Sequence, residues 1–305
     1  MKIEIKGYTE QYKQGVLQCL KNNYSWMAET SDEQLYEWTK PFMEYDWKDR
    51  LPDAIKPYQH GIIFLNGQQV VGFLGFIYSR RHWNGHEYVY QNGTTWAINE
   101  GYRIYLFKAL KKADALADVL GDFTPIRAVE ETLTKIFKYK YIDRSVYRFY
   151  PVPYLHRESL IYKMIENKDE ISDEISDEIL RTEFQDHQPY GVKCLKISDG
   201  HNDSYIFFRV NQRIRRHRKI FRRRRSILKI LKLTNPDLFC SHYREIVWHL
   251  QKGEHPYVQI EPRFIAPHHL NGFGIKKKKV VRLGLNKTGW DIPVDLLYSE
   301  EALLP

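Results

Sequence analysis

Two Asn-Gly pairs separate three strand-like stretches in the first half of the chain, and this pattern constrains the fold more than any other feature. The stretches are residues 61–65, 69–79 and 86–98, and the pairs are Asn66-Gly67 and Asn84-Gly85. Asn-Gly is the preferred pair of tight hairpins because both of its positions tolerate a positive φ. The sequence therefore predicts an antiparallel meander of three strands.

Helical periodicity appears on both sides of this meander. The alternating residues 2–6 predict a strand, and helices are expected after Thr9 and after Ser31, which stands at capping-box spacing from Gln34. Four more elements are expected beyond the meander: a helix over 102–115, a short strand at 122–123, a helix capped by Thr124, and a strand over 141–150. The order β, α, α, β, β, β, α, β, α, β predicts an α+β fold with helices layered on both faces of a mainly antiparallel sheet.

The second half repeats this order more weakly. Strands are predicted over 190–200, 203–210, 226–233, 257–261 and 278–285, with a helix that starts at 234–236. A chain of 305 residues is long enough for two domains. We therefore predict two domains of similar fold, residues 1–155 and 156–305. The acidic tract at the boundary is interpreted as one solvated helix with Ile171, Ile175 and Ile179 as a narrow apolar stripe, and a protein-binding helix is the alternative.

The net charge of +9 favours an anionic partner. Basic residues gather in a segment over 209–232, and residues Arg213 to Arg225 are either an anion-binding site or a solvated hairpin. The three cysteines, Cys19, Cys194 and Cys240, show no metal spacing and indicate reduced thiols. No metal site is predicted. The N-terminus lacks a signal-peptide pattern and no apolar run reaches membrane-spanning length, so we expect a cytoplasmic protein.

Two motifs resemble the GNAT N-acetyltransferase family over residues 1–150. The first is TTWAINEGYR (94–103), which runs from a strand into a helix, and the second is TPIRAVEETLTKIFKYKYIDR (124–144). The closing tract 291–304 also looks like the tail of two-domain GNAT-like proteins that often accompany cell-surface polysaccharide synthesis. The resemblance implies a tandem GNAT-like fold with a degenerate second domain, and acyl-CoA as co-substrate.

In this family the helix N-terminus holds the pyrophosphate of acyl-CoA, and the preceding strand polarises the thioester carbonyl. The resemblance implies that the cofactor is held by Trp96, Ile98, Gly101, Tyr102, Arg103 and Thr124. Arg103 matches the first position of the phosphate loop, whereas Leu106 and Lys108 stand where the family has glycine and another small residue. Glu87 and Glu100 are the candidates for a catalytic base, and an exposed glutamate at a strand end is the alternative for each.

Three functions remain open from the sequence. The first is a cytoplasmic acyltransferase that acylates an amine or hydroxyl of a small molecule, glycan, sugar or cell-envelope precursor. The second is a non-catalytic module of the same fold whose basic segment binds a polysaccharide, nucleic acid or lipid surface. A Fem-like aminoacyl transferase is the third, although the long helical arm of that group is not evident.

Overall fold

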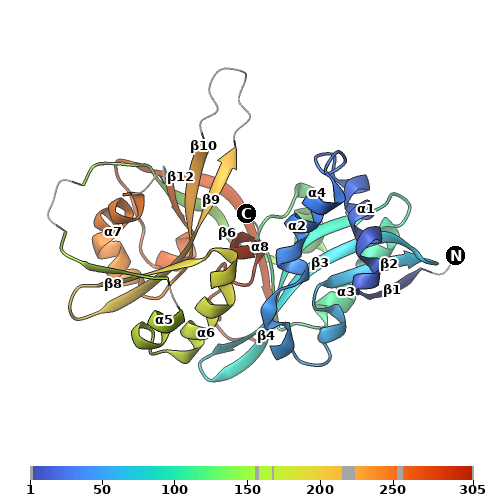
Figure 1. Ribbon diagram of the computed structural model, residues 1–305, viewed down its shortest axis with the longest axis horizontal. Coiled ribbons are helices and arrows are strands. Elements are labelled where there is room, and N and C mark those ends of the chain that lie inside the picture. The colour runs from blue at the N-terminus through green and yellow to red at the C-terminus, as the bar shows by residue number, and fades with distance from the viewer. Residues whose placement is uncertain (1–2, 155–157, 167, 215–223, 253–256, 304–305) are drawn as a thin grey trace, which may run out of the picture. The chain divides into compact units, whose positions relative to one another are not determined.

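A computed structural model describes residues 3–154, 158–166, 168–214, 224–252 and 257–303 (Figure 1). The chain divides into two compact units, each built from separated segments. Unit 1 consists of Met1–Lys140, Arg282–Pro293 and Tyr298–Leu304, and unit 2 of Tyr141–Val281, Val294–Leu297 and Pro305.

Unit 1 contains the predicted meander with helices on either side in sequence. Its main elements are β1 (Glu4–Gly7), α1 (Lys13–Asn23), α2 (Asp32–Met43), β2 (Gly61–Asn66), β3 (Gln69–Trp83), β4 (His86–Ile98), α3 (Leu106–Asp114), β5 (Val119–Asp122), α4 (Arg127–Lys135) and α8 (Glu300–Leu303). The strands follow one another across the sheet in the order β1-β2-β3-β4-β5. Asn84 and Gly85 both have positive φ, 48° and 78°, which confirms the second predicted hairpin turn. Ser31 caps α2 by accepting a hydrogen bond from the Gln34 backbone N–H at 3.2 Å, as predicted.

Unit 2 has a second sheet plan of the same kind. Its elements are β6 (Lys140–Phe149), β7 (Ile161–Ile165), α5 (Lys168–Glu174), α6 (Glu178–His187), β8 (Lys193–Ser198), β9 (Asp203–Ile214), β10 (Arg224–Leu233), α7 (Pro236–Gln251), β11 (Tyr257–Ile260) and β12 (Ile275–Asn286), which continues into unit 1. The strands run in the order β6-β11-β10-β9-β8-β7. The basic segment supplies β9 and β10, and its middle, 215–223, lies outside the described residues.

The two units exchange their closing strands. The strand predicted over 141–150 to close the first half is β6, which pairs with β11 of unit 2 through Phe149 and Val258. The sheet of unit 1 is closed instead by the last residues of β12, where Leu283 pairs with Asp122 of β5. The units therefore differ from the predicted ranges 1–155 and 156–305 in where they place these strands and the C-terminal segment.

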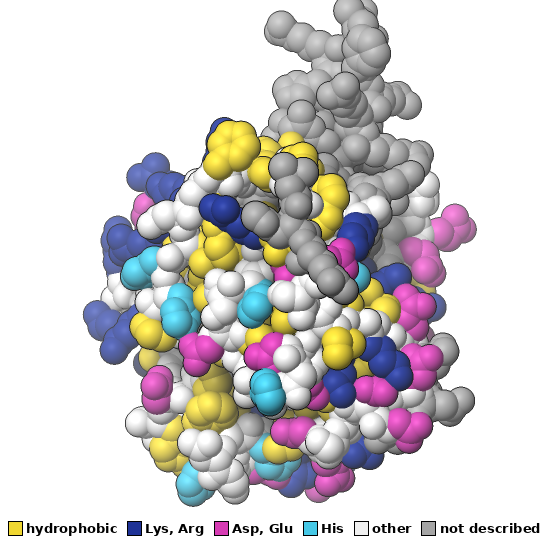
Figure 2. All heavy atoms as spheres, turned by 90° about the vertical axis from the view of Figure 1, so that its left-hand side faces the viewer, with side chains coloured by type: hydrophobic (Ala, Val, Ile, Leu, Met, Phe, Trp, Pro, Cys, Tyr) yellow, Lys and Arg dark blue, Asp and Glu magenta, His cyan; other side chains and the backbone are white. Residues whose placement is uncertain are grey.

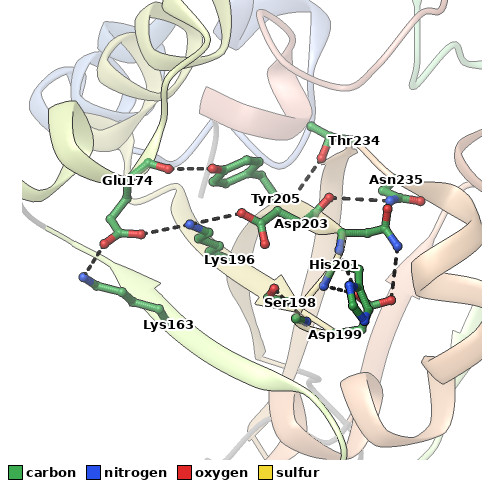
Figure 3. Close-up of polar contacts among 12 residues, drawn as sticks. Lys163, Glu174, Lys196, Ser198, Asp199, His201, Asp203, Tyr205, Thr234 and Asn235 are labelled. Atoms are coloured by element: carbon green, nitrogen blue, oxygen red, sulfur yellow. Dashed lines mark hydrogen bonds and ion pairs between the residues drawn. The ribbon is translucent and has the colours of Figure 1, made fainter.

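The acidic tract forms two short helices, so the prediction of one solvated helix is wrong. α5 ends at Glu174 and α6 begins after Asp177, whose side chain accepts a hydrogen bond from the Leu180 N–H at 3.0 Å. Ile171 and Ile175 are fully buried. Figure 3 shows Glu174 between Lys163 and Lys196, at 2.6 and 3.1 Å. Hydrogen bonds from these lysines lower the pKa of the Glu174 carboxyl and fix α5 against the sheet.

Candidate active site

The parallel strands β4 and β5 separate partway along β4. Their last paired residues are Gly93 and Asp122, where β5 ends, while β4 continues to Ile98. The pairing of β4 with β3 shifts register in the same place, between Leu74 and Phe76. Such a bulge bends the strand and increases its twist. The result is an opening between two neighbouring strands of one sheet, within unit 1.

Tyr24 makes hydrogen bonds with backbone groups of β4 at this opening. The Tyr24 hydroxyl lies 2.8 Å from the Trp96 carbonyl oxygen, to which it donates, and 3.3 Å from the Trp96 N–H, from which it accepts. In an antiparallel pair a residue points both backbone groups either at its partner or away from it. Those of Trp96 therefore point away from β3, to the edge that β5 has left.

A narrow pocket lies beneath this edge. It is lined by β4, β5, α3 and α4, and its free volume of about 10 Å³ is that of about one water molecule. Three buried polar atoms of lining residues, Trp96 Nε1, Gln91 Oε1 and Asp114 Oδ1, have no hydrogen-bond partner among the described residues. An unsatisfied buried donor or acceptor is costly. One donor and two acceptors are thus available to a polar ligand at this position.

The opposite face of the same strands carries a buried carboxyl group. Asn92 of β4 donates through its side-chain amide to Glu300 of α8, and the Thr124 hydroxyl donates to the other Glu300 oxygen at 2.9 Å. Neighbouring strand residues point to opposite faces. Because Gln91 and Gly93 line the pocket, Asn92 and Glu300 lie across the sheet from it.

Burial shifts the titration of two carboxyl groups beside the opening. Glu300 is 5% exposed, and burial, with the charge of Glu301, raises its pKa to about 7. Burial also raises the pKa of Asp122 well above its usual value, and the charge of Glu300 adds to this shift. Glu300 therefore changes charge near neutral pH. A pKa near the working pH is the value that best suits a general base.

Helix α8 is held in unit 1 by Arg282 of β12. The buried Arg282 guanidinium lies 3.0 Å from the Glu301 carboxylate and also donates to the Phe123 carbonyl oxygen. This arrangement corrects the role predicted for Thr124. The N-cap of α4 is Ile126, with no side-chain cap, and the Thr124 hydroxyl contacts Glu300 instead.

The loop between β4 and α3 turns at Gly101, where φ is +89°. No side chain caps the 3₁₀ turn Arg103–Tyr105 or the start of α3. The first N–H groups of a helix lack intrahelical partners and carry partial positive charge, which suits an anion. Arg103 and Lys108 are exposed in this region, and Ile104 and Phe107 expose apolar side chains beside them.

The structure groups some of the predicted site residues and separates others. Trp96 and Thr124 both lie at the opening, and buried Ile98 is the last residue of β4. Exposed Glu100 lies in the loop that follows, together with Tyr102, whose hydroxyl accepts from the Asn66 amide at 3.0 Å. Glu87 lies at the opposite end of β4, where Arg80 holds its pKa below the usual value.

The corresponding place in unit 2 is filled by the chain itself. β10 and β11 are also parallel and pair only from Ile227 to Lys229, but the Leu296 N–H donates to the Leu231 carbonyl beyond that point at 2.9 Å. The helix that follows, α7, is capped by Asn235, whose side chain accepts from the Leu238 N–H. Unit 2 thus has neither an open strand edge nor an uncapped helix at these positions.

Comparisons with known proteins identify the architecture. No protein-family model matches the sequence, and no curated protein matches it significantly. Among solved structures, a GCN5-related N-acetyltransferase from Anabaena variabilis superposes with a TM-score of 0.57 at 11% identity, covering 94% of this chain and 73% of that one. A putative acetyltransferase from Pyrococcus horikoshii gives 0.55 at 12% identity, covering 99% and 95%.

A third structure, a probable N-acyltransferase from Enterococcus faecalis, gives a TM-score of 0.57 at 10% identity over 94% of this chain and 73% of that one. Within the described residues, no helix is both long and apolar enough to cross a membrane, and no cluster of metal-ligating side chains is present. The likeness covers 94% or more of this chain, and therefore extends over both units. The chain has the fold of the GCN5-related N-acetyltransferases.

Proposed function

We propose that unit 1 is an acyltransferase that moves an acyl group from acyl-CoA to an amine or hydroxyl. The observation that carries this proposal is the buried Glu300 carboxyl, with a pKa of about 7, beside the opening between β4 and β5. The fold supports the reaction class, because the structures it resembles are described as acetyltransferases and acyltransferases. Unit 2, whose equivalent edge is filled, is proposed to have no catalytic role.

The donor would be held by unit 1 at three levels. The uncapped turn before α3, with Arg103 and Lys108 beside it, provides positive charge for the CoA phosphates. The pantetheine arm carries amides, which match the free indole N–H of Trp96 and the free side-chain oxygen of Gln91. The thioester would lie at the edge of β4 that β5 leaves after Gly93.

Glu300 is assigned the role of general base in preference to Glu87 and Glu100. Its carboxylate accepts the proton of the acceptor's amine or hydroxyl while the nitrogen or oxygen attacks the thioester carbonyl carbon. The carbon–sulfur bond then breaks, and CoA leaves as the thiolate. The Trp96 N–H is bonded to the Tyr24 hydroxyl. Other backbone N–H groups at this edge of β4 stabilise the negative charge that develops on the carbonyl oxygen. The acceptor class proposed from the C-terminal tract is a sugar or cell-envelope precursor in the cytoplasm.

Calorimetric titration with acetyl-CoA tests the donor site directly. The parent chain is expected to bind, and Arg103→Ala is expected to weaken binding about tenfold, because one charge-assisted phosphate contact is lost. Arg144→Ala, which removes an exposed arginine of unit 2, is the matched control and should leave the affinity unchanged. Absence of acetyl-CoA binding by the parent chain would refute the proposed function.

Acceptors can then be found by following thiol release from acetyl-CoA with a panel of amino sugars, sugar alcohols and simple amines. Glu300→Gln should retain donor binding and lose release, which separates the chemical step from binding. Equal release by the parent and by Glu300→Gln would remove Glu300 from the mechanism.

A further inference from the structure

Unit 2 contains a larger pocket that the proposed acyltransferase reaction does not use. Its volume is about 220 Å³, and every lining residue belongs to unit 2. An apolar cavity of about 150 Å³ holds a benzene molecule, so this one has room for a somewhat larger ring system. The lining is mainly aromatic and aliphatic, from Tyr150, Tyr154, Tyr243, Val247, Trp248 and Ile275, with Arg244 as its one charged side chain.

The walls of the pocket are fixed by hydrogen bonds. The Tyr154 hydroxyl donates to Glu245 at 3.3 Å, and the Gln251 amide donates to the Phe149 carbonyl at 3.3 Å. The Tyr150 N–H donates to the Gly274 carbonyl at 2.8 Å, which joins the two segments at the rim. A side chain that is already held by a hydrogen bond loses little conformational entropy when a ligand binds. Affinity is therefore not reduced by the cost of ordering that side chain.

The Glu245 carboxylate, which Tyr154 of the lining contacts, does not present an unpaired negative charge to the pocket. Glu245 is 1% exposed and accepts hydrogen bonds from the backbone N–H groups of Ser159 and Leu160, both at 2.8 Å. The hydroxyls of Ser159 and Tyr162 also donate to it, at 2.7 and 3.0 Å. Burial alone would raise its pKa, but these hydrogen bonds bring the pKa below the usual value, so the group is ionised and satisfied within the fold.

Positive charge lies at the mouth instead. Arg244 is exposed, and its guanidinium stands 5.8 Å from the centre of the Tyr243 ring while its Nε donates to the Tyr243 hydroxyl at 3.0 Å. Lys276 Nζ lies 5.3 Å from the centre of the Tyr150 ring. Figure 2 looks on to unit 2 and shows Lys and Arg side chains near exposed hydrophobic ones.

Aromatic walls and a cationic rim together define a ligand class. Ring faces pack against other flat rings, and a guanidinium binds a carboxylate with two parallel hydrogen bonds. Phe273, 89% exposed in the lining, adds apolar surface that no described residue covers. We propose that this pocket binds a small, flat, ring-bearing monocarboxylate, with its ring between the tyrosines and Trp248 and its carboxylate on Arg244.

A matched pair of probes tests the proposal on the full chain: 2-naphthoate and its neutral counterpart 2-naphthamide, compared by calorimetry. Naphthoate is expected to bind at least tenfold more tightly than naphthamide. Arg244→Gln should remove that difference by weakening naphthoate about tenfold, and Arg144→Gln, an exposed arginine of unit 2 outside the lining, should not. Ile275→Trp should abolish binding of both probes by filling the cavity.

Three outcomes would overturn the inference: no binding of naphthoate, equal binding of the two probes by the parent chain, or the same loss with Arg144→Gln as with Arg244→Gln. The result does not depend on the Ile275→Trp variant if that protein fails to fold, because the arginine pair carries the test.

Discussion

The Tyr24 hydroxyl makes hydrogen bonds with both the N–H and the carbonyl of Trp96, at 3.3 and 2.8 Å. These are backbone groups of β4 on the side where β5 no longer runs beside it. A single side chain from the C-terminal end of α1 thus satisfies the two backbone groups of Trp96. The same edge is the part of the fold at which we propose that the thioester is polarised.

Tyr24→Phe is expected to lower the free energy of unfolding by about 1–3 kcal/mol, because it leaves two backbone groups of Trp96 without their partner. Urea denaturation of the parent and the variant measures this difference. Tyr12→Phe is the control, since its hydroxyl accepts a hydrogen bond from the Lys6 side chain rather than from a backbone group, and its effect should stay within about 0.5 kcal/mol. Equal stability of Tyr24→Phe and the parent would contradict the assigned role.

Local signals in the sequence predicted the fold of unit 1 well. Asn84-Gly85 encodes a turn within its own two residues, and the Ser31 cap requires only Gln34 three positions later. The expected elements formed for this reason, from β1 through α4. The sequence did not predict that β12 rather than β6 pairs with β5. These strands are far apart in the chain, and the local sequence pattern of a strand does not indicate its distant pairing partner.

The candidate site was predicted only in part, for the same physical reason. Trp96 and Thr124 lie next to local landmarks, a strand-to-helix junction and a helix start. Glu300 is 208 residues from Asn92, and nothing in the tract SEEALL distinguishes a buried acid from an exposed one. Glu87 and Glu100 are the sequence-based candidates because both lie near the predicted strand of residues 86–98, which is a weaker criterion than burial.

Glu300→Gln is expected to lower kcat/KM by about 10²–10⁴-fold, the usual contribution of a positioned base. The amide keeps the size of the side chain and removes its capacity to accept a proton. Acetyl-CoA affinity should change by less than about threefold. Glu87→Gln, at the far end of β4, serves as the control and should retain full activity. A loss of activity in Glu87→Gln as large as that in Glu300→Gln would return the assignment to the sequence-based candidate.

The pH profile of activity should follow Glu300. Because its pKa is about 7, kcat/KM is expected to rise through about pH 7 as the carboxylate forms and then to level off. Stopped assays from pH 5.5 to 8.5, with acetyl-CoA held well below its KM, measure this profile. A profile that is flat across this range would show that Glu300 does not supply the base.

Stability should depend on pH in the opposite direction. The folded pKa of Glu300 is raised, so its protonated form favours folding below the unfolded value of about 4.5, and this stability is lost as pH rises through about 7. The loss amounts to about 3 kcal/mol between these limits. Glu300→Gln should therefore match the parent near pH 4.5 and exceed it at pH 8 in thermal denaturation. If the difference in stability between the parent and Glu300→Gln is the same at pH 4.5 and pH 8, the raised pKa of Glu300 is contradicted.

Arg282 and Glu301 form the buried ion pair that fixes α8, with 3.0 Å between guanidinium nitrogen and carboxylate oxygen and about 5–7% exposure of each side chain. Arg282→Met leaves the Glu301 charge buried without this partner, and it should lower the free energy of unfolding by about 3–5 kcal/mol. The double variant Arg282→Met with Glu301→Met removes both charges and should recover most of that loss, because well-packed apolar residues often replace a buried pair without penalty. Urea denaturation of the single and double variants measures the two values. If the double variant is as unstable as the sum of Arg282→Met and Glu301→Met measured separately, the pair does not act as a unit.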